Sequence, residues 1–148
     1  TFFVDADSFL DERKIKRFFD STPLDQELAI HSKVMLRNGT TAHIPMADMA
    51  TNAKAPLIKL QTLLEHTGFG GFKWYSSGRS FHGYGDRLLS DSDWIRLMGA
   101  LLLSNQRGMN PIVDPRWIGH RLLAGYSTLR WTKNTKHYID YPSNINLE

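Results

Sequence analysis

Acidic residues at the start of the chain have the spacing of a metal site. The segment FFVDAD (residues 2–7) places Asp5 and Asp7 two residues apart after an apolar run. In a β-strand these side chains share one face, about 7 Å apart at Cα. Two carboxylates this close repel each other, and a divalent cation removes the repulsion. Their oxygen ligands suit Mg²⁺ or Mn²⁺. We expect a metal site here; the alternative is that Asp7 caps a following helix and Asp5 is merely exposed.

A second group of polar side chains lies in SSGRSFHGY (residues 76–84). On a strand, Ser80, His82 and Tyr84 would share one face. Arg79 lies at the preceding turn, where Gly78 allows a ligand to approach the backbone closely. Hydroxyl, guanidinium and imidazole groups on one surface suit a polyphosphate. The alternative for His82 is a half-buried imidazole that is hydrogen-bonded to the backbone.

A third group lies in IVDPRWIGHRLLAGYSTLRWTK (residues 112–133). Asp114 follows an apolar pair and is a candidate third carboxylate. Arg121 is either a surface arginine or a second phosphate ligand. A strand over residues 126–133 would place Arg130 on a polar face open to a ligand, and Trp131 on the core face. The alternative for Arg130 is an ordinary solvated sheet face.

The elements that position these groups can be placed from turn, cap and periodicity signals. We expect helices over roughly 8–22, 55–67 and 91–103, the last capped by Ser90 with Asp93 three residues on. We expect strands over 2–6, 72–76, 80–84, 112–114 and 126–133, a hairpin over 33–44 turning at Asn38-Gly39, and loops over 45–53 and 105–111. This mixture predicts an α+β fold, with helices on a largely antiparallel sheet, in a single domain over residues 1–148.

Composition limits the classes of protein to consider. The chain has 148 residues, 41% hydrophobic, a formal net charge of +3 and no cysteine. Disulfides, thiolate catalysis and cysteine-built zinc sites are therefore excluded. No apolar run approaches the roughly 20 residues that span a bilayer, so we expect a cytoplasmic protein without a membrane partner. Between residues 106 and 137 there are six Lys or Arg and one acid, and residues 1–53 hold eight acids. This distribution favours a site that handles both a metal and phosphates.

Taken in order, the three groups resemble the motifs of the archaeo-eukaryotic primase superfamily. They read as an apolar run with Asp-x-Asp, then small-x-His (Ser80-Phe81-His82), then apolar-Asp (Val113-Asp114). The continuation from Asp114 through Arg121-Leu122 to Gly125-Tyr126 is similar to the primase domains of plasmids and viruses. The resemblance implies an RRM-like catalytic core. It also implies a template-dependent nucleotidyltransferase, a DNA primase or primase-polymerase, that joins nucleotides by two-metal phosphoryl transfer.

The resemblance also implies roles for individual residues. Asp5, Asp7 and Asp114 would bind Mg²⁺ or Mn²⁺ and, with His82, form the catalytic group. Ser80 and His82 would contact the nucleotide phosphates, flanked by Arg121 and Arg130, and local geometry adds Arg79. The implied partners are nucleoside triphosphates, a DNA template and primer, and helicase or other replication domains. Aromatic residues either stack on bases or pack in the core: Trp74, Tyr75, Trp117 and Tyr126.

Two departures from the family pattern and three alternatives accompany this interpretation. Relatives carry a longer segment before the first motif, so we expect that segment to be missing, rearranged or cut away here. Without cysteines we expect no typical zinc module, which weighs against independent primer initiation. The alternatives are a catalytically inactive primase-like domain that binds nucleic acid, a metal-dependent nuclease or phosphatase, and a glycosyltransferase. Phosphatases with DxDx[TV] have Thr or Val where this chain has Phe9, and 148 residues is small for a nucleotide-sugar domain.

Overall fold

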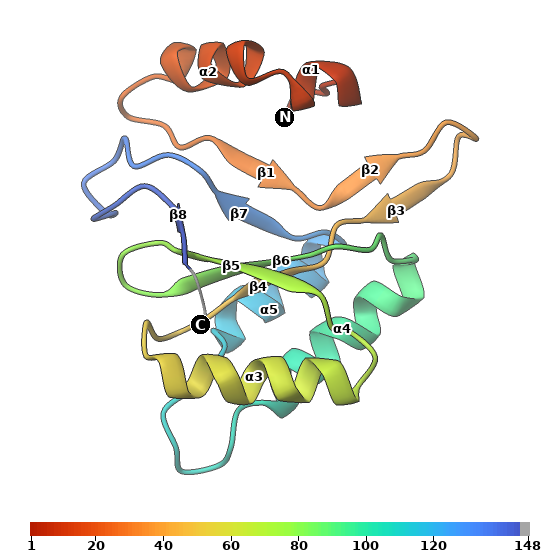
Figure 1. The fold of residues 1–148 in the computed structure, drawn as a ribbon, viewed down its shortest axis with the longest axis vertical. Coiled ribbons are helices and arrows are strands. Elements are labelled where there is room, and N and C mark those ends of the chain that lie inside the picture. Colours follow the sequence, from red (N-terminus) through yellow and green to blue (C-terminus); the bar gives the residue numbers. More distant parts are fainter. Residues whose placement is uncertain (146–148) are drawn as a thin grey trace.

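The computed structural model describes residues 1–145 and confirms the α+β class, with helices on antiparallel strands (Figure 1). The helices are α1 (Ala6–Leu10), α2 (Glu12–Ser21), α3 (Lys54–His66), α4 (Asp91–Leu103) and α5 (Pro115–Ala124). The strands are β1 (Ala29–His31), β2 (Lys33–Met35), β3 (Thr41–His43), β4 (Met46–Asp48), β5 (Phe72–Ser76), β6 (Phe81–Gly85), β7 (Thr128–Arg130) and β8 (Ser143–Asn144). Within the described part of the chain, none of the helices has the length and apolar character needed to cross a bilayer.

The main sheet has the order β4-β6-β5-β8, and every pairing in it is antiparallel. One face carries Ala47, Trp74 and Phe81, which are buried against apolar residues of α3 and α4 such as Leu60 and Leu97. Both helices lie below the sheet in Figure 1. Because successive side chains of a strand point to opposite faces, the residues between these core positions face the other way. The second face is therefore the one that can carry a polar site.

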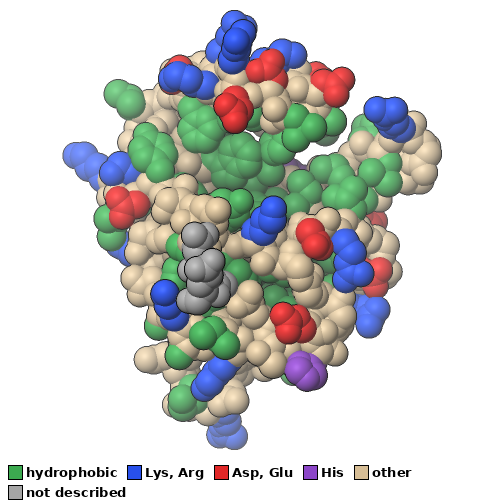
Figure 2. All heavy atoms as spheres, in the orientation of Figure 1, with side chains coloured by type: hydrophobic (Ala, Val, Ile, Leu, Met, Phe, Trp, Pro, Cys, Tyr) green, Lys and Arg blue, Asp and Glu red, His purple; other side chains and the backbone are tan. Residues whose placement is uncertain are grey.

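Two smaller pairs, β1–β7 and β2–β3, lie above the main sheet, and α1 and α2 form the uppermost layer (Figure 1). Phe9 and Phe19 attach this layer, with ring centroids 5.6 and 6.1 Å from the half-buried Trp131. On the face drawn in Figure 2, hydrophobic side chains gather just below the two helices, and Lys and Arg stand around the margin. The layer thus covers apolar surface through a few aromatic contacts.

Several local predictions are confirmed. The hairpin turns at Asn38-Gly39, where Gly39 has a φ of 81° that a glycine adopts without strain. Strands β5 and β6 form the expected hairpin, and the Ser90 side chain accepts a hydrogen bond from the Asp93 amide at the start of α4. These features depend on residues close together in sequence, which is why the sequence predicts them.

Two local predictions are wrong, and both bear on the site. Residues 2–5 do not form a strand: the side chain of Asp5 accepts a 2.7 Å hydrogen bond from the Ser8 amide and caps α1. The stretch 45–53, expected to be a loop, contains β4. In addition, α5 was not anticipated, although Asp114 caps it and Pro115 occupies its first turn. Pro is well suited to that position because the amide it lacks has no partner there.

Candidate functional site

Asp48 and His82 face each other on the polar side of the main sheet. Strands β4 and β6 pair antiparallel with Asp48 directly opposite His82. His82 Nε2 lies 3.6 Å from Asp48 Oδ1, which is a polar contact longer than a hydrogen bond. The Asp48 side chain is 23% exposed and that of His82 only 6%. The Asp48 carboxylate is therefore partly open to solvent, whereas the His82 imidazole beside it is almost completely buried.

Asp114 is held beside Asp48 by backbone pairing. Val113 forms an antiparallel bridge with Met49, and the Asp114 amide donates a 3.0 Å hydrogen bond to the Asp48 carbonyl. One oxygen of Asp114, Oδ1, accepts hydrogen bonds from the amides of Arg116 and Trp117 at the start of α5. In residues 1–145 no hydrogen bond reaches its other oxygen, Oδ2. The Asp114 carboxylate thus anchors a helix through one oxygen, while its other oxygen has no hydrogen-bond partner within residues 1–145.

Arg130 brings a positive charge to the same place from β7. Its guanidinium donates hydrogen bonds to the carbonyls of Ser77 (2.7 Å), Thr132 (2.7 Å) and Asp140 (3.0 Å). The ring of Tyr138 lies 3.9 Å from its Cζ. The Ser77 contact fixes the guanidinium at the turn between β5 and β6. A guanidinium has five N–H groups, so two remain for a ligand.

Burial dominates the electrostatics of this group. Burial, reinforced by the negative charge of Asp114, raises the pKa of Asp48 to about 7, against the opposing effect of Arg130. Burial and the positive charge of Arg130 lower the pKa of His82 to about 4, so its imidazole is neutral at physiological pH. His82 Nδ1 is buried and has no hydrogen-bond partner within residues 1–145. The two carboxylates therefore lack a full counter-charge, and a polar atom nearby lacks a partner.

The other residues expected at the site are distributed differently. Ser80 lies at the β5–β6 turn, with its Oγ 3.0 Å from that of Ser77, whose carbonyl contacts Arg130. Arg79 is exposed at the same turn. Arg121 lies on α5 and donates to Thr128 Oγ1 on β7. The turn that carries Ser80 and Arg79 thus contacts the Arg130 guanidinium through Ser77, whereas Arg121 belongs to a separate contact.

The structure corrects the expected positions of Asp5 and Asp7. Both lie exposed at the N-terminal end of α1, and not beside β4, where Asp114 caps α5. The hydrogen bonds from the side chain and amide of Ser8 lower the pKa of Asp5, as expected for a helix cap. Among residues 1–145, no three His, Asp or Glu side chains are grouped so that they could hold a metal ion. The predicted trio of Asp5, Asp7 and Asp114 is therefore not formed.

Sequence reasoning missed Asp48, although a signal is present. The run Ile44-Pro45-Met46-Ala47 is apolar and ends directly at Asp48, as a short buried strand before a functional carboxylate would. Ala50 stands two residues later, where an Asp-x-Asp motif would have its second acid. Residues 46–50 thus have the pattern of the expected first motif, with one carboxylate rather than two.

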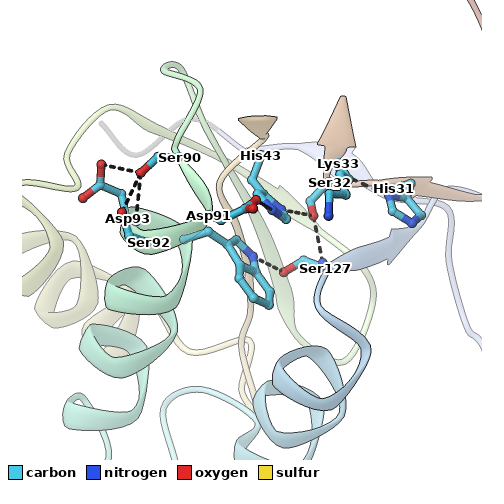
Figure 3. Close-up of polar contacts among 10 residues, drawn as sticks. His31, Ser32, Lys33, His43, Ser90, Asp91, Ser92, Asp93 and Ser127 are labelled. Carbon is cyan, nitrogen blue, oxygen red and sulfur yellow. Dashed lines mark hydrogen bonds and ion pairs between the residues drawn. The ribbon is translucent and has the colours of Figure 1, made fainter. Parts of the chain in front are cut away.

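A second polar cluster, drawn in Figure 3, has the order of a serine hydrolase relay. Ser32 Oγ lies 3.1 Å from His43 Nδ1, and His43 Nε2 lies 2.9 Å from Asp91 Oδ1. However, Ser32 is fully buried, and its Oγ accepts a 2.8 Å hydrogen bond from the Ser127 amide. The hydroxyl is thus out of reach of a substrate. The cluster is structural: it ties β3 to the start of α4 and to the chain entering β7.

Comparison with protein families finds a match over most of the chain. The model of the archaeo-eukaryotic primase 1D-like family matches residues 7–143. The chain belongs to this family. The match includes Asp48, His82, Asp114 and Arg130, and it confirms the resemblance seen in the sequence. Neither the curated proteins nor the solved structures contain a significant match.

Proposed function

We propose that this primase-family chain is a nucleotidyltransferase whose site consists of Asp48, His82, Asp114 and Arg130. It would add a nucleotide from a nucleoside triphosphate to the 3′ end of a primer on a DNA template, in the cytoplasm and alongside helicase or other replication domains. One observation supports this most strongly: backbone pairing of β4 with β6 and with Val113 brings Asp48, His82 and Asp114 together. Arg130 then adds the positive charge that a triphosphate requires.

The residues fit a hard divalent cation. Asp48 has a pKa near 7 beside a second carboxylate, so a cation would replace its proton and relieve the repulsion. Mg²⁺ commonly binds through one or two carboxylates and completes its shell with water and substrate phosphates. Asp48 and Oδ2 of Asp114 would hold Mg²⁺ or Mn²⁺, and the metal would supply charge neutralisation for the phosphates. The two-carboxylate site suits a metal that arrives with its nucleotide.

The protein's own groups would mainly bind and orient the triphosphate. Arg130 has two N–H groups left after its three carbonyl contacts, and these can donate to phosphate oxygens. The neutral His82 has an unpartnered Nδ1 for a further hydrogen bond. Ser80 and Arg79 lie at the adjoining turn. Because phosphoryl transfer depends on positioning and electrostatic stabilisation, no nucleophilic side chain is needed.

The test is incorporation of a labelled nucleotide on a primed DNA template with Mn²⁺. We expect Asp48→Asn and Asp114→Asn to lower the rate at least ~100-fold, because each removes a charged ligand. Asn caps a helix about as well as Asp, so Asp114→Asn should leave α5 intact. The matched control is Asp7→Asn on α1, which should keep the wild-type rate. Full activity of Asp48→Asn, or loss of activity in Asp7→Asn alone, would refute this assignment.

A second candidate is a primase-like domain that binds nucleotides without joining them. The observation that favours it is Ala50, which leaves two carboxylates where the predicted motif would provide three. Calorimetric titration with a nucleoside triphosphate and Mn²⁺ separates the two candidates. Binding that depends on Asp48 and Arg130, without incorporation by the wild-type chain in either Mg²⁺ or Mn²⁺, would support the binding-only function.

A further inference from the structure

A basic and aromatic cluster lies around the β1–β7 pair, apart from the proposed catalytic group. We call it the β1–β7 cluster; it consists of His31, Lys33, Arg121 and Tyr126. His31 pairs with Thr128 across the two strands, and Arg121 donates to the hydroxyl of the same Thr128. The rings of His31 and Tyr126 stack with centroids 3.9 Å apart. Residues from four different segments thus meet at one point on the surface.

The cations of the cluster lack counter-ions. In residues 1–145, no carboxylate lies within 4 Å of the charged nitrogens of Lys33 or Arg121. Arg121 Nε is also buried without a hydrogen-bond partner. Burial, followed by the positive charges of His43, Lys33 and Arg121, lowers the pKa of His31. An anionic ligand would supply the missing counter-charge.

The aromatic pair adds a second kind of recognition. His31 Nδ1 accepts a hydrogen bond from the Lys33 amide, so in the neutral ring Nε2 carries the proton and can donate (Figure 3). His31 and Tyr126 are both half-buried, so part of each ring is open to solvent. The Arg121 guanidinium lies 5.9 Å from the Tyr126 ring centroid. Aromatic rings next to cations bind unpaired bases by stacking while the cations bind phosphates.

Two elements connect the β1–β7 cluster to the proposed catalytic group, α5 and β7. Arg121 follows Asp114 by seven residues, which is two turns and about 10 Å along α5 on the same helix face. Thr128, which Arg121 contacts, precedes Arg130 by two residues and shares its face of β7. A strand that ends at the catalytic group would therefore pass the cluster within a few nucleotides.

We propose that the β1–β7 cluster binds single-stranded nucleic acid, with Arg121 and Lys33 on phosphates and His31 and Tyr126 against a base. The binding itself does not depend on the proposed function. Only the identity of the bound strand, as the one being copied or extended, rests on that function. Single strands are favoured over duplex because only unpaired bases expose a face to the rings. This surface accounts for cations that have no counter-ion among residues 1–145.

The test is fluorescence anisotropy of a labelled oligothymidylate in EDTA, with no nucleotide present. We expect Arg121→Gln to weaken binding roughly tenfold and to reduce the slope of log affinity against log salt by about one. Lys33→Gln, at an exposed position that cannot disturb the core, should have a smaller effect of the same kind. Tyr126→Leu should weaken binding without changing the salt slope. The matched control is Arg107→Gln, an exposed arginine between α4 and α5, which should bind within twofold of wild type.

Other outcomes would overturn the inference or separate it from the proposed function. Wild-type affinity in both Arg121→Gln and Lys33→Gln would overturn it, and so would equal losses in Arg107→Gln. Equal affinity for a duplex of the same length would overturn the preference for single strands. If Asp48→Asn keeps oligonucleotide binding and the wild-type chain incorporates no nucleotide, the proposed function fails and the cluster stands. If incorporation is confirmed and both Arg121→Gln and Lys33→Gln bind normally, only this inference fails.

Discussion

Ser32 should contribute far more to stability than a buried serine usually does. Its Oγ accepts a hydrogen bond from the Ser127 amide and contacts His43 Nδ1, and the side chain is fully buried. Because the hydroxyl accepts from the amide, its own proton is directed to Nδ1, and His43 Nε2 donates to Asp91. Ser32→Ala therefore leaves the Ser127 amide and His43 Nδ1 without partners in a site that water does not reach.

The size of the effect follows from the two orphaned groups. A buried donor or acceptor that loses its partner costs about 1–3 kcal/mol, so the pair should cost about 2–6 kcal/mol. This is a large part of the roughly 5–15 kcal/mol that stabilises a domain. Since Ser32 joins the chain entering β4 to the chain entering β7, we also expect the variant to displace Asp48 and Arg130 relative to each other.

The assay is urea unfolding of the full chain, followed by tryptophan fluorescence and circular dichroism. Ser104→Ala is the matched control, because Ser104 is buried as well but its Oγ bonds only to the Leu101 carbonyl of its own helix. That carbonyl also accepts from the Ser104 amide, so the control should lose about 1 kcal/mol or less. A difference between the two variants below about 0.5 kcal/mol would refute the argument that Ser32 satisfies two buried groups.

Two further predictions concern the same framework. Burial lowers the pKa of His43 despite its hydrogen bond to Asp91, so the unfolded chain, with a histidine pKa of 6.5, takes up the proton first. The His43 contribution to stability should therefore be complete above pH 6.5 and fall as the pH decreases below it. Because the raised pKa of Asp48 acts in the opposite direction and the lowered pKa of His82 in the same one, the test compares wild type with His43→Gln between about pH 7.5 and 5.5, and an identical change of thermal midpoint in the two would contradict the role of His43. Gly83 lies between His82 and Tyr84, and a Cβ there would stand 2.5 Å from Cζ3 of Trp74, so Gly83→Ala should destabilise the β5–β6 pair and lower nucleotide incorporation. The control is Gly99→Ala on α4, where a Cβ meets nothing within 4 Å; it should raise the free energy of unfolding by about 0.5–1 kcal/mol in the same assay. Equal effects of the two substitutions would show that contact with Trp74 does not restrict position 83 to glycine.

The sequence by itself determined the features that depend on neighbouring residues. Asn38-Gly39 defines a hairpin, and Ser90 with Asp93 defines a helix start, because the groups that interact are within a few residues of each other. The alternation around His82 placed it on the polar face of β6, and the order of short motifs indicated the primase family. These inferences need no knowledge of what packs against the segment.

Only the tertiary structure decided which acids meet at the site. The segment FFVDAD has the alternation of a strand, but Asp5 finds Ser8 as a local partner and starts a helix instead. Conversely β4 has only three residues, too few to show a pattern, and it exists because β6 and Val113 supply hydrogen bonds on both sides. Asp48 gains its raised pKa, and its neighbours Asp114 and Arg130, from segments 66 and 82 residues away in sequence. Long-range pairing of this kind carries no local signature, so it can be seen only once the chain is folded.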